Sequence, residues 1–280
     1  MKINVAKSAG FCVGVKRALN IALETAKSCG EVYMLGDIVH NEDVVRRIEQ
    51  KGIRKIARLA KNKSKILLIR AHGASKETIE KAKGLGYRII DATCPMVKEI
   101  HKIAHSMEKK GYRIIIIGDK EHDEVRGIIG QLRDKATVID SPEKIPIKTI
   151  RGMKKAAVVV QSTQNIDKAM KILGALRLYI EDLKFFNTIC RPTQIKQSEI
   201  KKMPEENEVM IVLGSKNSAN TKRLYEIAKT LNPRSYWISR PNELKKYWFV
   251  GAKTVGVTAG ASTPDSTTKK VVALLKKLTS

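Results

Sequence analysis

Long apolar segments are missing from this sequence of 280 residues. Apolar runs such as Ile114–Ile117 and Ala156–Val160 have the length of a β-strand, whereas a membrane helix needs ~20 apolar residues in a row. Residues 1–10 contain lysines but no apolar stretch of the kind that a secretory signal has. We therefore expect a cytoplasmic protein without a membrane partner.

Acidic and aromatic residues are also scarce. The chain has 54 Lys and Arg against 28 Asp and Glu, a net charge of +26, and 5% of its residues are aromatic. A positive field favours anionic partners, but the basic residues are spread along the chain and few rings are present to stack on bases. We interpret the charge as a lysine-rich surface, with a docking face for an acidic electron carrier as a second interpretation; nucleic acid is not expected as a partner.

Cysteine pairs of the CxxC type do not occur, although the chain has four cysteines, at Cys12, Cys29, Cys94 and Cys190. Their absence argues against a zinc ribbon, a thioredoxin motif and a typical ferredoxin cluster. Because nothing in the sequence suggests secretion, disulfides are not expected either.

The sequence does contain a regular alternation of short β-branched runs and amphipathic helical stretches, which is typical of α/β proteins with parallel sheets and crossover helices. Strands are expected at residues 3–6, 32–35, 66–70, 88–90, 113–118, 156–160, 209–213, 235–238 and 254–257. Helices are expected at residues 15–28, 43–51, 76–83, 95–110, 166–180, 192–202, 221–230 and 265–278.

Three of the cysteines occur in similar settings. Asp91-Ala-Thr-Cys94-Pro95 and Asn187-Thr-Ile-Cys190-Arg-Pro192 each place a cysteine just before a proline that can begin a helix, and Gly10-Phe-Cys12 also precedes a helical stretch. These cysteines are 82 and 96 residues apart, which suggests three α/β units of similar size, each presenting one cysteine. Cys29, at the end of a helical stretch, has no counterpart.

Several interpretations of these cysteines stay open at this point. Unpaired cysteines are among the most buried residues, so each could simply fill a core. A helix N-terminus, however, stabilises a thiolate, and three converging thiolates could hold a cubane iron–sulfur cluster that leaves one iron for a substrate oxygen. A Cys/His hydrolase is a further alternative, but it needs only one cysteine as its nucleophile.

Polar loops follow several of the expected strands, where ligands bind in open parallel sheets. Three of the loops contain a histidine, at His40, His72 and His122, whose protonated ring can contact phosphate oxygens. Ser/Asn-containing loops at 214–220 and 258–262 precede helices, whose N-termini favour anions. For these loops, simple helix capping and phosphate binding both stay open. A basic RNA-binding protein whose loops contact phosphates is an alternative to a small-molecule enzyme.

Three other titratable residues have weaker signals. Glu124, two residues after His122, is expected in a loop, where it either caps the next helix or serves as an acid beside a metal-bound substrate. His101 and His105 have the i, i+4 spacing of zinc ligands, but no glutamate stands in the HExxH position. We interpret this pair as exposed or structural.

In their order along the chain, these residues resemble the motifs of the 4-hydroxy-3-methylbut-2-enyl diphosphate reductase family, the last enzymes of the non-mevalonate isoprenoid pathway. The resemblance covers essentially the whole chain. The matching segments are Gly10-Phe-Cys12, Val39-His40-Asn41, Ala71-His72-Gly73, Asp91-Ala-Thr-Cys94-Pro95, His122-Asp123-Glu124, Gly214-Ser-Lys-Asn-Ser218 and Thr258-Ala-Gly-Ala-Ser262.

The resemblance implies an α/β fold of three small pseudo-symmetric domains with parallel sheets, arranged as a trefoil around a central cavity. The expected domains are 14–93, 94–190, and 191–280 together with 1–13. The resemblance further implies one [4Fe–4S] cluster per chain, with one open iron and three cysteine ligands, which here are Cys12, Cys94 and Cys190. Cys29 matches none of these ligands.

The resemblance also implies a reductive dehydroxylation that yields isopentenyl and dimethylallyl diphosphate. For the electrons, an acidic donor such as ferredoxin or flavodoxin would suit the basic surface. Glu124 matches the acid of the family's proton relay, with Ser162 or Thr163 as its hydroxyl partner. The diphosphate would contact His40, His72, His122, Ser218, Ala219, Asn220 and Ser262.

Three positions depart from the family pattern. Asp123 replaces the proline of His-Pro-Glu and adds a charge beside the acid. Ser162 stands in the Gln-Thr-Thr segment, where a hydroxyl is retained. Ala219 replaces a serine of Ser-Ser-Asn, so one hydroxyl contact to the diphosphate is missing, although the backbone N–H remains. We therefore expect weaker substrate binding, not lost activity.

Overall fold

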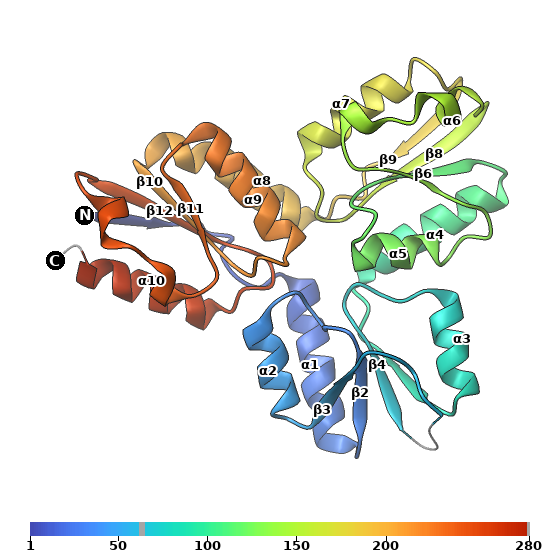
Figure 1. Cartoon of the computed structure of the whole chain (residues 1–280), viewed down its shortest axis with the longest axis horizontal. Helices are drawn as coiled ribbons and strands as arrows, with labels where there is room; N and C mark the ends of the chain where they lie inside the picture. The colour runs from blue at the N-terminus through green and yellow to red at the C-terminus, as the bar shows by residue number, and fades with distance from the viewer. Residues whose placement is uncertain (62–64, 279–280) are drawn as a thin grey trace. The chain divides into compact units, whose positions relative to one another are not determined.

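The structure is a computed structural model that describes residues 1–61 and 65–278 (Figure 1). The described residues form twelve strands in three four-stranded sheets, and every strand pair is parallel. The predicted α/β class with three parallel-sheet units is therefore confirmed. None of the described helices is both long enough and apolar enough to span a membrane.

One compact unit comprises Met1–Lys16, Val39–Arg46 and Arg191–Ser280. Its sheet has the order β1-β12-β10-β11. The strands are β1 (Lys2–Val5), β10 (Val209–Leu213), β11 (Ser235–Ile238) and β12 (Thr254–Ala259). They alternate along the chain with α8 (Arg191–Glu206), α9 (Ala219–Leu231), the 3₁₀ turns η2 (Pro241–Glu243) and η3 (Lys246–Phe249), and α10 (Asp265–Leu278).

The second compact unit comprises Arg17–Ile38 and Arg47–Cys190 and holds the other two sheets. The sheet of order β3-β2-β4-β5 consists of β2 (Val32–Leu35), β3 (Ile53–Ile56), β4 (Ile66–Ile69) and β5 (Arg88–Asp91). In the chain α1 (Val13–Ser28) precedes β2, α2 (Glu42–Glu49) lies between β2 and β3, and α3 (Lys76–Gly84) lies between β4 and β5. The first residues of α1 and α2, up to Lys16 and Arg46, belong to the first unit.

The remaining sheet of this unit has the order β7-β6-β8-β9. Its strands are β6 (Arg113–Ile117), β7 (Thr137–Ile139), β8 (Lys155–Val160) and β9 (Asp182–Phe186). The accompanying helices are α4 (Pro95–Lys109), α5 (Asp123–Ile129), the 3₁₀ turn η1 (Pro142–Lys144), α6 (Ile147–Arg151) and α7 (Ile166–Leu176).

Apolar strands explain where the cores lie. The central strands β6, β8 and β10 are buried along almost their whole length because helices cover both faces of a parallel sheet. Side chains on one face of β8 pack against α7, and those on the other face pack against α4 and α5. Each fully buried Val, Leu or Ile contributes roughly 1.5–3 kcal/mol.

The three sheets repeat one topology. Starting from one edge, their orders are β1-β12-β10-β11, β5-β4-β2-β3 and β9-β8-β6-β7. The edge strands β1, β5 and β9 are those followed by Cys12, Cys94 and Cys190. The internal repeat inferred from the cysteine loops is thus confirmed, while the three domain boundaries 14–93, 94–190 and 191–280 plus 1–13 stay a prediction.

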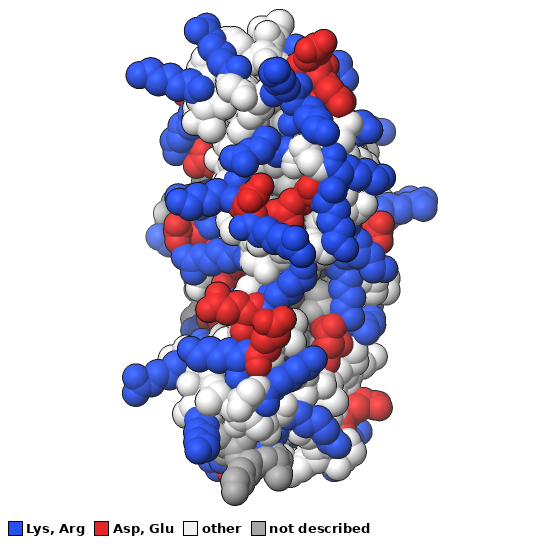
Figure 2. Space-filling view, turned by 90° about the vertical axis from the view of Figure 1, so that its right-hand side faces the viewer, with Lys and Arg blue, Asp and Glu red and all other residues white. Residues whose placement is uncertain are grey.

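Three of the edge strands were not predicted from the sequence. The strands β3, β7 and β9 each lie at a sheet edge and carry exposed or half-exposed residues, so they lack the apolar run of a central strand. The short helices α5 and α6 were also not predicted. On the face drawn in Figure 2, lysine and arginine side chains are interspersed with acidic ones, as expected for a lysine-rich surface.

Candidate functional site

Each of the three predicted iron ligands lies directly before a long helix. Cys12 precedes α1, Cys94 is the N-cap of α4, and Cys190 precedes α8. The backbone N–H of each donates to a carbonyl in the loop that follows the neighbouring strand: Cys12 to Ala261 at 3.1 Å, Cys94 to Ala71 at 3.0 Å, and Cys190 to Ser162 at 3.0 Å. The sheet topology therefore ties each cysteine to one polar loop.

The surroundings of these cysteines suit thiolates. All three lie at helix N-termini, where the helix dipole favours negative charge. The N–H of Val15, in the first turn of α1, also lies 3.4 Å from the sulfur of Cys12. Cys29 instead follows the end of α1, and Arg88 donates to its sulfur at 3.2 Å. Three soft thiolates of this kind fit an iron–sulfur cluster, and Cys29 lies apart from this pattern.

Glu124 is a buried carboxyl held by a single residue. It lies in the first turn of α5 and is 1% exposed, so the expectation that it lies in a loop was wrong. Its two oxygens accept hydrogen bonds from the backbone N–H and the hydroxyl of Ser162, each at 2.6 Å. Burial raises the pKa of Glu124, and the bonds from Ser162 offset only part of this effect. The carboxyl therefore holds its proton to a higher pH than an exposed glutamate does.

Thr163, the other predicted relay hydroxyl, has a different partner. The side-chain NH₂ of Gln161 donates to its hydroxyl at 3.1 Å, and the oxygen of the same side-chain amide accepts from the N–H of Asp119 at 2.9 Å. Gln161 is buried, whereas Thr163 is partly exposed. Of the two candidate hydroxyls, Ser162 is therefore the one in contact with Glu124.

His72 and His122 lie together in the second compact unit. Their ring centroids are 5.4 Å apart in an edge-to-face arrangement. His122 is the N-cap of α5, and its Nδ1 accepts from the N–H of Glu124 at 3.1 Å. The same turn thus positions both the ring of His122 and the buried carboxyl of Glu124, because the cap fixes both residues.

Asp123, the extra charge beside the acid, is ion-paired. Its carboxylate accepts from the guanidinium of Arg70 at 2.6 Å, and the two side chains are 22% and 21% exposed. Arg70 precedes the Ala71-His72-Gly73 loop, and Asp123 precedes Glu124. The pair therefore connects the His72 loop to the N-terminus of α5, a link that no sequence signal indicated.

His101, in α4, packs against the Ala71-His72-Gly73 loop. A Cβ added to Gly73 would lie 3.0 Å from its ring, and one added to Gly127 would lie 3.5 Å from its Nε2. Burial lowers the pKa of His101 to about 4, so the ring is neutral at physiological pH. The interpretation of His101 as structural agrees with this packing.

The predicted phosphate loops lie in the first compact unit. Ser218 caps α9 by accepting from the N–H of Thr221 at 3.3 Å, and Ala219 begins that helix. Asn220 is 4% exposed, and its amide oxygen and nitrogen have no hydrogen-bond partner among the described residues. The hydroxyl of Ser262 donates to the carbonyl of His40 at 3.1 Å. A buried, unsatisfied amide beside a helix N-terminus fits an anionic ligand.

Glycines allow the loops at 214–220 and 258–262 to pack closely. A Cβ on Gly214, which has a φ of +151°, would lie 2.6 Å from the hydroxyl of Thr221, and one on Gly260 would lie 2.1 Å from it. Glu42 also supports the first loop, since it accepts from Ser215 at 2.8 Å and from Asn217 at 3.1 Å. Neither Glu42 nor Thr221 was identified from the sequence.

The predicted residues therefore fall into two sets. The first compact unit brings together Cys12, His40, Ser218, Ala219, Asn220 and Ser262. The second brings together His72, Cys94, His122, Glu124, Ser162, Thr163 and Cys190.

Comparison with known proteins assigns the family. A family model described as LytB protein matches residues 3–276. The chain belongs to the LytB family. Among curated LytB relatives, the 4-hydroxy-3-methylbut-2-enyl diphosphate reductase of Aquifex aeolicus is 39% identical over 99% of this chain and 96% of its own length. The enzyme of the same name from Geobacter metallireducens is 38% identical over 100% of this chain and 99% of its own length.

Solved structures of the family agree with the fold. One described as (E)-4-hydroxy-3-methyl-but-2-enyl diphosphate reductase, the terminal enzyme of the non-mevalonate pathway, has a TM-score of 0.71 at 38% identity, covering 99% of this chain and 100% of the other. The E-1-hydroxy-2-methyl-but-2-enyl-4-diphosphate reductase from Plasmodium falciparum has a TM-score of 0.89 at 28% identity, covering 98% of this chain and 88% of the other. The predicted membership of this family is confirmed.

Proposed function

We propose that this chain reduces 4-hydroxy-3-methylbut-2-enyl diphosphate to isopentenyl and dimethylallyl diphosphate, the last step of the non-mevalonate isoprenoid pathway. The observation that carries the proposal is the repeated bond from a cysteine N–H to a polar loop. Those loops contain Ser262, His72 and Ser162, each a predicted substrate or relay residue. The repeat thus ties each candidate iron ligand to a group that contacts the substrate or moves a proton.

Enzymes of the LytB family depend on iron–sulfur, and the cysteine set of this chain fits such a centre. We assign one [4Fe–4S] cluster per chain to Cys12, Cys94 and Cys190, which leaves one iron without a protein ligand. When bound, the cluster supplies electrons one at a time to the allylic substrate. In the sequence each cysteine lies at or next to a border between two of the domains 14–93, 94–190 and 191–280 plus 1–13, and we propose these as the domains of the chain.

The side chains of this protein bind the substrate and supply protons. We assign the diphosphate contacts to His40, His72, His122, Ser218, Asn220, Ser262 and the backbone N–H of Ala219. Glu124 serves as the acid, since burial raises its pKa and favours the protonated form, and Ser162 passes the proton to the bound substrate. The allylic C–O bond breaks and the hydroxyl leaves as water. A proton then adds at either end of the allyl group, which gives the two products.

An acidic electron carrier, ferredoxin or flavodoxin, is the proposed donor. The net charge of +26 favours association with such a partner, and lysine and arginine side chains are spread over the face in Figure 2. Rates of reduction by the carrier should therefore fall steeply as salt is added.

Iron and acid-labile sulfide, measured in protein purified without oxygen, test the proposal. About four of each per chain are expected from one cubane cluster. Serine at Cys12, Cys94 or Cys190 should lower both values, whereas Cys29→Ser is the matched control and should leave them unchanged. Loss of iron in the control would overturn the ligand assignment. Neither iron nor sulfide after anaerobic reconstitution of the unmodified protein would overturn the cofactor and the reaction.

A further inference from the structure

A buried lysine lies beneath the loop that leads to Cys12. Lys196, in α8, is 2% exposed. Its ammonium group donates to three backbone carbonyls, those of Ser8, Gly10 at 3.1 Å and Ala259 at 3.0 Å. Three acceptors match the three N–H bonds of an ammonium group, which must be satisfied when the group is removed from water.

Glu199 binds the same loop from the next turn of α8. Its carboxylate accepts from the N–H of Lys7 at 2.9 Å and of Ser8 at 3.0 Å, and also from the hydroxyl of Ser8. Residues three apart lie on one face of a helix, so Lys196 and Glu199 face the loop together. One side chain binds carbonyls and the other binds N–H groups. The backbone of residues 7–10 is therefore fixed by a cation and an anion at once.

The bonds of Lys196 reach two parts of the candidate site. Gly10 lies two residues before Cys12, and Ala259 ends β12 just before the loop that contains Ser262. The two loops also contact each other, since the N–H of Cys12 donates to the carbonyl of Ala261. The helix that carries Lys196 begins directly after Cys190. A single helix face thus supports the Cys12 loop and the Ser262 loop.

We infer that Lys196 and Glu199 form an α8 clamp that positions Cys12 for iron binding and Ser262 for the diphosphate. The inference rests on the proposed function. Without the ammonium group, three backbone carbonyls, two of them buried, lose their shared donor, and the loop before Cys12 can shift. Outer-shell groups that orient metal ligands change metal affinity by roughly 10–100-fold when removed. Lys196 is therefore a positioning residue that acts through Cys12 and Ser262.

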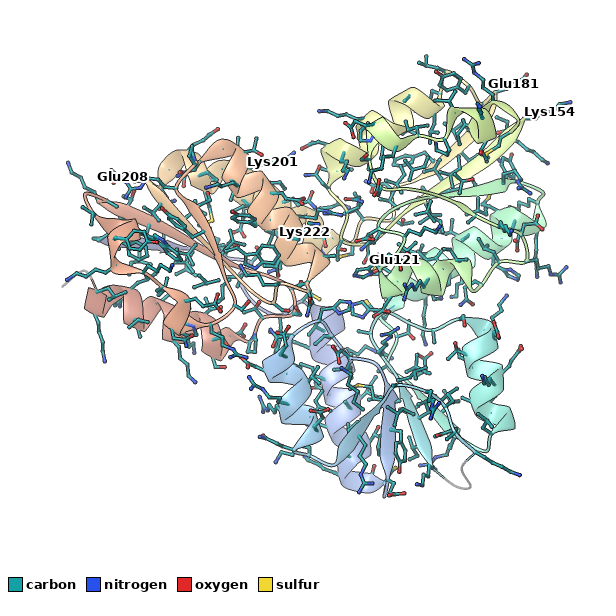
Figure 3. The ribbon with its side chains drawn as sticks, viewed as in Figure 1. Glu121, Lys154, Glu181, Lys201, Glu208 and Lys222 are labelled. Carbon is teal, nitrogen blue, oxygen red and sulfur yellow. The ribbon has the colours of Figure 1, made fainter. Side chains whose placement is uncertain are left out.

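Two variants and one matched control test the clamp. Lys196→Met keeps the length of the side chain but removes the charge and the N–H donors. Glu199→Gln removes the negative charge of the second clamp residue while keeping the size of its side chain. Lys202→Met changes an exposed lysine of the same helix and is the control. Lys201, labelled in Figure 3, marks this part of α8. Lys196→Arg tests for rescue, because a guanidinium can also donate to several carbonyls.

The first measurement uses metal-free protein and the rate at which iodoacetamide labels each thiol, read by mass spectrometry. We expect Lys196→Met and Glu199→Gln to raise the rate at Cys12 several-fold while the rate at Cys29 stays unchanged. Lys196→Arg should restore part of the protection, and Lys202→Met should behave as the unmodified chain. Equal acceleration at both cysteines would identify a general loss of stability and would overturn the clamp. Unchanged labelling of Cys12 would also overturn it.

The second measurement uses reconstituted protein. Iron affinity should fall roughly 10–100-fold in Lys196→Met, and the midpoint potential of the remaining cluster should shift, while Lys202→Met changes neither. The KM for the diphosphate should also rise, because the Ser262 loop loses its support. Unchanged iron affinity, potential and KM would overturn the clamp without affecting the proposed function. An unmodified chain that takes up no iron would overturn the proposed function, and the labelling ratio would still decide the clamp.

Discussion

Both oxygens of Glu124 are bound by Ser162, which donates from its backbone N–H and from its hydroxyl at 2.6 Å each. The carbonyl of the same serine accepts from the N–H of Cys190 at 3.0 Å. One residue therefore fixes the orientation of the acid and the loop of a candidate iron ligand. Hydrogen bonds to both oxygens lower a carboxyl pKa, but complete burial of Glu124 has the larger effect and raises it.

Replacing Glu124 by Gln should lower turnover by roughly 10²–10⁴-fold, the range that a positioned acid supplies. The amide still accepts from the N–H of Ser162, so iron and sulfide content should not change. Glu121→Gln is the matched control, because Glu121 is an exposed partner of Arg126 and is labelled in Figure 3. Turnover that survives Glu124→Gln would show that Glu124 is not the acid.

The pH dependence of stability should also report Glu124. Its pKa is raised in the folded state, so the unfolded chain releases this proton first as the pH rises from the ordinary value of 4.5. The stability contributed by the buried neutral carboxyl is complete below that pH and is lost as the pH rises through the folded pKa. The melting temperatures of Glu124→Gln and the unmodified chain should therefore diverge above pH 4.5, and that of the variant should become the higher one. Parallel melting curves would contradict the raised pKa.

The cysteine loops were predictable because their signal is local. A cysteine before a helix start is visible in three short segments, and the structure puts Cys12, Cys94 and Cys190 at equivalent edge strands. The supporting contacts were not predictable, since Lys196 reaches Ser8 from 188 positions away and Glu42 reaches Ser215 from 173 positions away. The edge strand β3 was missed because two charged residues, Arg54 and Lys55, separate its two isoleucines, so no apolar run marks it in the sequence.

Restoring a hydroxyl at position 219 should strengthen substrate binding. Ala219 begins α9 between Ser218 and Asn220, so a serine there would offer a second hydroxyl to the diphosphate. A hydrogen bond to a charged group is worth about 1.5–3 kcal/mol, which predicts a KM lowered by about tenfold or more in Ala219→Ser with little change in kcat. Ala175→Ser, on α7, is the control. Equal KM values for Ala219→Ser and the unmodified chain would contradict the proposed contact.

Gly260 should not tolerate a side chain. An added Cβ would lie 2.1 Å from the hydroxyl of Thr221, which is fully buried next to Asn220. We expect Gly260→Ala to displace the Asn220 turn and raise the KM for the diphosphate more than it lowers kcat. Gly174→Ala is the control, because nothing lies within 4 Å of its added Cβ and alanine favours a helix by ~1 kcal/mol. A Gly260→Ala enzyme with normal KM would show that the two loops need not pack closely.

The ion pair between Arg70 and Asp123 should couple the His72 loop to α5. Its side chains are 21% and 22% exposed, so the pair is less screened than a surface pair. Asp123→Pro restores the family residue at a helix position that accepts proline, but it leaves the guanidinium of Arg70 without this partner. We expect Asp123→Pro and Arg70→Gln each to raise the KM for the diphosphate.

The double variant decides whether the two residues act together. Contacting residues typically show interaction energies of about 0.5–3 kcal/mol in double-mutant cycles. Arg70→Gln combined with Asp123→Pro should therefore bind the diphosphate better than the sum of the single losses predicts, because the double variant removes both charges of this ion pair and not just one. Strictly additive changes in KM and in melting temperature would mean that the pair does not couple the loop to the helix. In that case Asp123 would act only as the first residue of α5, where a carboxylate favours the helix N-terminus without help from Arg70.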